Sequence, residues 1–179
     1  RDDVESRGLG DVYKRQVVAR STTHDLDSPW EYYVCDASGQ YIWQHTYPTQ
    51  EEISRSRIQE TDCSMPWVFK KGDSYYMVAQ SKWFGHEMYI FRSDKPYGPF
   101  IERKSLFNIP NTLDKLGPQE YGNLYMVNLH PHLSRNGELV FSTNNDAKDW
   151  GDNFNAVGSA DYYRPYFYRV YNWEKVYEE

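Results

Sequence analysis

The sequence predicts an all-β fold built from antiparallel strands, and two observations support this prediction. The first is composition: aromatic residues make up 17% of the 179 residues and include 17 tyrosines. This composition favours half-buried strands and interface surfaces over a helical bundle, which would be rich in Leu and Ala. The second is a strand–turn–strand pattern that occurs more than once along the chain. The length allows one domain with a sizeable core.

The first strands are expected before residue 48. Residues 17–21 and 30–35 are rich in β-branched and aromatic residues, and a polar turn separates them. Residues 48–60 are polar, and we interpret them as a loop insertion. Within it, Thr49 is followed three residues later by Glu52, which is the pattern of a capping box and predicts one short helix.

The clearest unit spans residues 58–107. It contains four strand-like segments separated by short turns, at 66–70, 74–81, 87–93 and 100–106. Gly72 in the first turn can adopt the positive φ that a tight hairpin needs. Four antiparallel strands joined by short hairpins form a meander, which is the repeating unit, or blade, of a β-propeller.

The pattern recurs near the end of the chain, where residues 132–142 resemble residues 68–79 and Gly137 aligns with Gly72. Any two hairpins share part of this pattern, so unrelated hairpins remain the alternative. Counted as blades, the chain holds the end of one, a complete one and a last one, at 17–47, 58–107 and 121–173. The predicted fold is therefore a partial β-propeller of about two and a half to three four-stranded blades of an expected five.

Residues 1–16 differ in composition from the rest of the chain and show neither a helical nor a strand period. They resemble translated sequencing-adapter stretches at the ends of metagenomic reading frames, so we expect them to be non-native. A disordered or peripheral segment is the alternative. The propeller domain is then expected at residues 17–179, as the C-terminal part of a domain whose first blades are missing. No signal peptide is visible in the sequence.

Charge and composition exclude several classes of function. The formal net charge is −6 and no basic block stands out, so we expect no nucleic-acid partner. No apolar run approaches the ~20 residues of a membrane span. Cys35 and Cys63 lack metal-ligand spacing, and they can pair or remain thiols. We therefore expect no metal site of the His, Cys, Asp and Glu type.

Several stretches of the sequence carry a resemblance to a known superfamily. Residues 65–77 (MPWVFKKGDSYYM) and 93–100 (SDKPYGPF) resemble five-bladed propeller glycosidases, the superfamily of arabinanases, β-xylosidases and levansucrases. Residues 127–134 (VNLHPHLS) and 163–167 (YRPYF) are similar to bacterial propeller families long catalogued as of unknown function, one of which includes endo-D-arabinanases. The resemblance covers about residues 17–173.

The resemblance implies part of a glycoside hydrolase that acts on an arabinose-type or related polysaccharide or oligosaccharide. It implies no cofactor beyond a channel ion such as Ca²⁺, and a secreted, periplasmic or cell-surface location. A non-catalytic propeller that binds glycan or protein is the alternative. A third interpretation is a truncated reading frame without independent function, because exposed blade faces invite aggregation.

Glycoside hydrolysis needs two carboxyl groups facing the scissile bond. In the resembling glycosidases these groups lie where the innermost strands open onto a central channel, which points to Glu60 and Asp62 as the candidate catalytic residues. Alternation places both on one side of an extended segment. A solvated loop, or a salt bridge to Arg55 or Arg57, is the alternative. Because the superfamily's catalytic base usually comes from the first blade, we expect an incomplete catalytic set.

Four residues are candidates for substrate binding. The resemblance implies that His130, on the expected last inner strand, lines the channel and helps hold an ion or waters. His132 is the other choice for this role, and a packing or surface histidine is the alternative for both. Trp83, in an expected loop, can stack on a sugar ring. Asn145 in an expected polar turn can hydrogen-bond sugar hydroxyls, although Asn is an ordinary turn residue. Arg164 can bind a sugar or latch the last blade through an ion pair.

Overall fold

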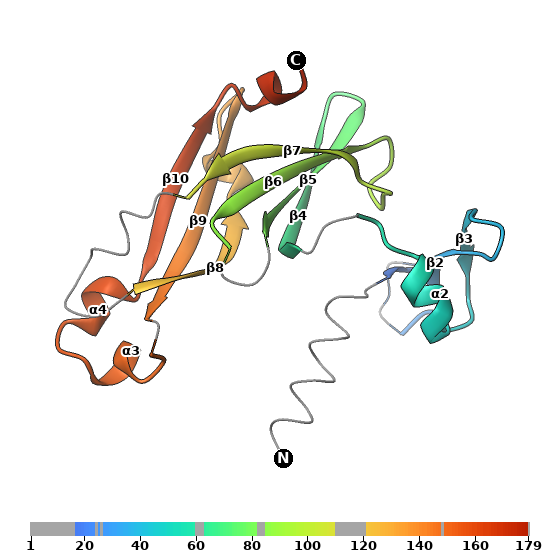
Figure 1. The fold of residues 1–179 in the computed structure, drawn as a ribbon. Helices are drawn as coiled ribbons and strands as arrows, with labels where there is room; N and C mark the ends of the chain where they lie inside the picture. The colour runs from blue at the N-terminus through green and yellow to red at the C-terminus, as the bar shows by residue number, and fades with distance from the viewer. Residues whose placement is uncertain are drawn as a thin grey trace. The chain divides into compact units, whose positions relative to one another are not determined.

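The computed structural model describes residues 17–23, 25, 27–59, 63–81, 85–109, 121–147 and 149–178. The chain divides into two compact units, one of residues 1–60 with 97–101, and the other of residues 61–96 with 102–179. Most described elements are strands, and all their pairings are antiparallel, so the predicted all-β class is confirmed. Figure 1 shows the elements in chain order.

The first unit contains a three-stranded sheet in the order β1 (Val18–Ser21), β2 (Trp30–Cys35) and β3 (Tyr41–Gln44). Tyr33 is 3% exposed and forms the centre of its small core. The Tyr33 ring stacks on Tyr41 with 5.1 Å between ring centres, and it lies 4.9 Å from Trp43. The aromatic richness of the sequence is thus used here for cross-strand packing.

The short helix α2 (Gln50–Arg55) begins where the capping pattern predicts. The Thr49 hydroxyl accepts a hydrogen bond from the Glu52 amide, and the Glu52 carboxylate accepts one from the Thr49 amide. At the other end of α2, the buried Ser56 hydroxyl accepts a hydrogen bond from the Cys35 amide at 2.7 Å. The helix is therefore fixed at both ends, once by its own cap and once to the sheet.

The second unit contains the predicted meander, a four-stranded sheet in the order β4 (Cys63–Lys71), β5 (Ser74–Ser81), β6 (Glu87–Ser93) and β7 (Ile101–Asn108). The bounds of β5 and β6 agree with those expected from the sequence. Gly72 has a φ of 58°, which confirms the tight turn between β4 and β5. This sheet is the complete four-stranded unit that the sequence indicates.

The other sheet of the second unit has three strands, in the order β8 (Tyr121–Leu129), β9 (Glu138–Ala147) and β10 (Pro165–Tyr171). Two local expectations are wrong here. Neither His130 nor His132 is on a strand, because β8 ends at Leu129 and Pro131 opens the short helix η2 (Pro131–Leu133), whose first position suits proline. Residues 144–146 do not form a polar turn, because their pairing with β8 continues β9 to Ala147.

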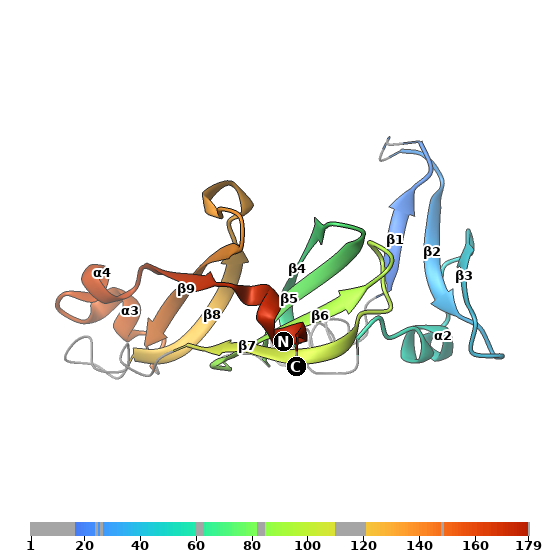
Figure 2. The ribbon, with the colours of Figure 1, turned by 90° about the horizontal axis from the view of Figure 1, so that it is seen from above.

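The two sheets of the second unit pack on each other around one shared core (Figures 1 and 2). The four-stranded sheet contributes Val78, Met88 and Ile90, and the three-stranded sheet contributes Leu124, Leu129, Leu139 and Phe141. The short helix η3 (Trp173–Tyr177) completes this core with Trp173, which is 3% exposed. Successive meanders packed in this way are what a propeller requires, and the ring itself stays a prediction.

In the described part of the chain, no helix has the length and apolar character needed to cross a membrane.

Candidate functional site

Three of the sequence-predicted site residues lie outside the described residues. These are the two candidate catalytic acids, Glu60 and Asp62, and the candidate stacking residue Trp83. Their roles stay predictions.

His130 follows β8 and is half-buried on one face of the three-stranded sheet. Its Nε2 atom lies 2.8 Å from the Ser142 hydroxyl, and its ring centre lies 5.4 Å from that of Phe167 and 5.8 Å from that of His132. Within the described residues, no group of three or more His, Cys, Asp or Glu side chains is placed to hold a metal ion. The observed contacts of His130 are those of packing and hydrogen bonding.

Asn145 and Arg164 have different surroundings. Asn145 is 0% exposed and pairs in register with Leu124 of β8, so its side chain lies in the interior. Arg164 is exposed, and its guanidinium carbon lies 5.5 Å from the centre of the Tyr166 ring. Of these two residues, only Arg164 is placed to meet a ligand from solvent.

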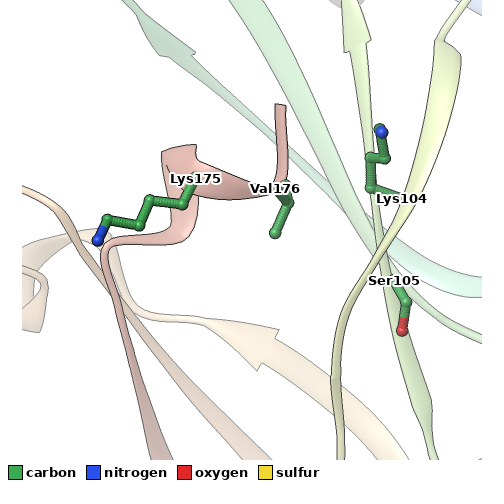
Figure 3. Close-up of a pocket in the computed structure, with 4 residues that line it drawn as sticks. All are labelled: Lys104, Ser105, Lys175 and Val176. Atoms are coloured by element: carbon green, nitrogen blue, oxygen red, sulfur yellow. The ribbon is translucent and has the colours of Figure 1, made fainter. Parts of the chain in front are cut away.

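A hollow of about 390 Å³ lies beside η3 and is lined by Lys104, Ser105, Lys175 and Val176. Figure 3 shows the two lysine side chains extending in different directions, so their ammonium groups do not converge on one point. A binding site for a compact anion needs donors that converge. This hollow therefore does not provide the best candidate site.

The best candidate site is an exposed group of rings in the segment between β9 and β10, which contains the one-turn helices α3 (Asp152–Asn155) and α4 (Ser159–Tyr162). We call Trp150, Phe154 and Tyr163 the aromatic cluster. Trp150 is 58% exposed and Phe154 is 63% exposed. Their ring centres lie 5.4 Å apart, and that of Tyr163 lies 6.5 Å and 6.4 Å from them. Rings this exposed bury little of their apolar surface against the protein and leave most of that surface open to solvent.

Hydrogen bonds to β8 and β9 hold the aromatic cluster in place. The Tyr163 hydroxyl lies 2.6 Å from the Tyr125 hydroxyl on β8. The Asn153 side chain, one residue before Phe154, donates a hydrogen bond to the Asp146 carboxyl and accepts one from the Ala147 amide at 2.9 Å. Asn153 and Asp146 are each 4% exposed. A buried polar pair thus fixes the loop that carries two of the exposed rings.

Burial raises the pKa of two groups in this region, Asp146 and Tyr125. Burial raises the pKa of the Asp146 carboxyl above its ordinary value of 3.8, against the effect of the hydrogen bond from Asn153. Burial, followed by the hydrogen bond with Tyr163, raises the pKa of the Tyr125 hydroxyl far above its ordinary value of 10.0. The Tyr125 hydroxyl therefore remains protonated at neutral pH.

The arrangement suits a ligand with both an apolar face and hydroxyl groups. The exposed rings can pack against the C–H groups of such a ligand, and the tyrosine hydroxyls at the same place can donate and accept hydrogen bonds. The Asp146 carboxyl is buried and positions the loop through Asn153. In the described residues, the cluster offers exposed rings and hydroxyl groups to a ligand, and it does not by itself supply a pair of catalytic acids.

The aromatic cluster is absent from the site residues expected from the sequence. A signal for it is present, because Trp150 and Phe154 are four residues apart in a stretch rich in Asp, Asn and Gly. Two large rings at that spacing share one face of a helical turn, and their polar neighbours indicate that the turn is solvated. Arg164, which the sequence does single out, follows Tyr163 of the cluster directly.

Comparisons with known proteins support both the fold and a family assignment. The profile of the family described as "Domain of unknown function (DUF5005)" matches residues 5–173, and so begins within the segment expected to be non-native. A crystal structure of a protein from Bacteroides ovatus, described as a "putative hydrolase", matches at 56% sequence identity with a TM-score of 0.82. The match covers 93% of this chain and 42% of that one. A search of curated proteins gave no match.

Proposed function

The chain belongs to the family described as Domain of unknown function (DUF5005), and from this premise we propose that it is part of a carbohydrate-active hydrolase and carries a sugar-binding surface at the aromatic cluster. The observation that carries the proposal is the exposure of Trp150 and Phe154 beside the paired hydroxyls of Tyr163 and Tyr125.

The name of the similar Bacteroides ovatus structure supports the hydrolase part of this proposal. This chain spans 42% of the length of that one, so the activity of a whole protein of this kind also depends on residues outside the matched region. The two packed meanders support a propeller arrangement. Arabinose-type polysaccharide is the substrate class that we propose, on the resemblance to propeller glycosidases.

The proposal is tested by measuring binding of arabinan and arabino-oligosaccharides to the chain by isothermal titration calorimetry. A stacked ring in a binding site contributes about 1.5 kcal/mol, so Trp150→Ala and Phe154→Ala should each weaken binding by roughly tenfold. Both side chains are largely exposed, so neither change should unfold the chain.

Two matched controls come from the first unit. Trp30 is 37% exposed and Tyr47 is 69% exposed, and Trp30→Ala and Tyr47→Ala should leave glycan binding unchanged. Equal loss of binding in control and cluster variants, or no binding of any glycan by the parent chain, would reject the sugar-binding surface.

Release of reducing sugar, measured in the same samples, separates the two functions expected from the sequence. Hydrolysis that falls in Glu60→Gln or Asp62→Asn supports the catalytic roles predicted for these residues. Binding without hydrolysis by this chain agrees with the incomplete catalytic set expected from the sequence. The same result in a longer protein that contains this region favours the non-catalytic, glycan-binding alternative.

A further inference from the structure

The three-stranded sheet of the second unit ends in β10, and β10 has an unusual surface for an edge strand. In the described residues β10 pairs with β9 on one side, whereas the neighbouring sheet has a fourth strand. Exposure alternates strictly along β10. The exposed residues are Pro165, Phe167, Arg169 and Tyr171, with Phe167 60% and Tyr171 64% exposed.

Edge strands are commonly protected against pairing by charged side chains, by proline or by short length, and β10 has a proline only at its first residue, Pro165. The charge on β10 is Arg169, and Glu138 of β9 neutralises it through an ion pair of 2.5 Å. The Arg169 guanidinium also donates a hydrogen bond to the Leu133 carbonyl, which fixes the side chain against the sheet. The edge therefore presents two large exposed rings and a compensated charge.

The sequence of β10 is self-complementary when two copies pair antiparallel. If Tyr168 pairs with Tyr168 of a second copy, Phe167 lies opposite Arg169 of that copy, and Pro165 lies opposite Tyr171. Each of these two pairs occurs twice because of the twofold symmetry. Directly opposed side chains lie about 4.5–5.5 Å apart, which suits a cation on an aromatic ring and a proline on a tyrosine ring.

The other face of β10 is compatible with this pairing. Tyr166, Tyr168 and Val170 are half-buried against the shared core, and the same register places Tyr166 opposite Val170 of the second copy. The Tyr168 hydroxyl is buried without a hydrogen-bond partner in the described part of the chain, and burial raises the pKa of Tyr168 to about 12. In the same register Tyr168 of the second copy lies opposite Tyr168, and each Tyr168 ring keeps its place against the core of its own copy.

We propose that β10 is a homodimerisation edge at which two copies of this chain pair antiparallel about Tyr168, joining two three-stranded sheets into one. The proposal is independent of the function proposed for the aromatic cluster, which lies on the segment before β10. Pairing adds backbone hydrogen bonds along the edge and covers Phe167 and Tyr171.

The test is sedimentation equilibrium of the full chain over about 1–100 μM, with two variants at one exposed position. Phe167→Lys places a cation opposite Arg169 of the second copy and should weaken the dimer at least tenfold. Phe167→Glu places an anion there and should keep the dimer within about threefold of the parent. A matched control, Trp67→Lys at a residue 40% exposed on β4, should leave dimerisation unchanged.

Three results would overturn the proposal: a monomeric parent chain throughout this range, equal weakening by Phe167→Lys and Phe167→Glu, or equal weakening by Trp67→Lys. Equal weakening by both changes at Phe167 would indicate unspecific contact between exposed rings. Far-UV circular dichroism of each variant establishes that the fold is retained. Dimerisation that persists in Phe167→Glu and is lost in Phe167→Lys confirms the register.

Discussion

The core position of Trp173 leads to a quantitative prediction about the second unit. The Trp173 ring is 3% exposed and makes edge-to-face contacts with Phe69 of β4 at 5.4 Å and with Tyr76 of β5 at 4.8 Å between ring centres. It also belongs to the core cluster that contains Leu139 and Phe141 of the other sheet. Trp173→Ala therefore removes a ring that both sheets share.

The expected cost of Trp173→Ala is about 4 kcal/mol of unfolding free energy. Truncation of a buried Trp to Ala costs about 3–5 kcal/mol, which includes the cavity left behind. The two aromatic contacts, at about 0.5–1.5 kcal/mol each, place the value in the middle of that range. With a urea dependence of about 2 kcal/mol per M, the unfolding midpoint should fall by about 2 M.

The assay is urea unfolding followed by far-UV circular dichroism, which does not depend on the fluorescence of the deleted ring. Trp150→Ala is the matched control, because Trp150 is 58% exposed and its removal should change stability by at most about 0.5 kcal/mol. For Trp173→Ala, a midpoint shift below about 0.5 M, or one equal to that of Trp150→Ala, would refute the assignment of Trp173 to a shared core.

Two further predictions concern Asp146 and Gly137. Burial gives folded Asp146 a pKa above 3.8, so the folded chain binds this proton more tightly than the unfolded chain, and stability should fall as the pH rises from 3.8 through the raised value. Asp146→Asn keeps an oxygen for the hydrogen bond from Asn153 but cannot ionise, so its stability should decline less with pH. The measurement is the urea midpoint of the parent chain and of Asp146→Asn from about pH 4 to 8. Parallel pH profiles of the two proteins would contradict this reasoning. Gly137 has a φ of 76° with open space where a Cβ would lie, so Gly137→Ala should cost about 1–2 kcal/mol through backbone strain alone. Gly137→Asn should lower the thermal unfolding temperature less than Gly137→Ala does, because Asn adopts a positive φ more readily than Ala. If Gly137→Ala and the parent chain unfold at the same temperature, position 137 carries no backbone strain.

The elements that the sequence predicts well are those whose local signals agree with their tertiary surroundings. The bounds of β5 and β6 are correct because turn residues flank both strands, and α2 begins correctly because Thr49 and Glu52 complete their cap within one turn. Such elements depend on residues close in sequence. The four-stranded meander follows from them because short hairpins leave little choice of partner.

The error at residues 144–146 arises where pairing over a distance overrides local preference, whereas the error at His132 has a local cause in Pro131. Residues 144–146 have the composition of a turn, yet their antiparallel partners on β8 keep them in a strand and bury Asn145 completely. The aromatic cluster escapes prediction for another reason. The spacing of Trp150 and Phe154 indicates a solvated turn, but the contact of Tyr163 with Tyr125 joins residues 38 positions apart and leaves no local signal in the sequence.

The position of η3 has a consequence for the synthesis of the second unit. All of its strands precede Trp173 in the chain, so the ribosome releases β4 to β10 before the residue that completes their core. At the usual rates of translation, the interval between β4 and η3 is on the order of ten seconds. During this interval Phe69 and Tyr76 lack the ring that covers them, so the nascent strands present a transient apolar surface to chaperones and to other nascent chains.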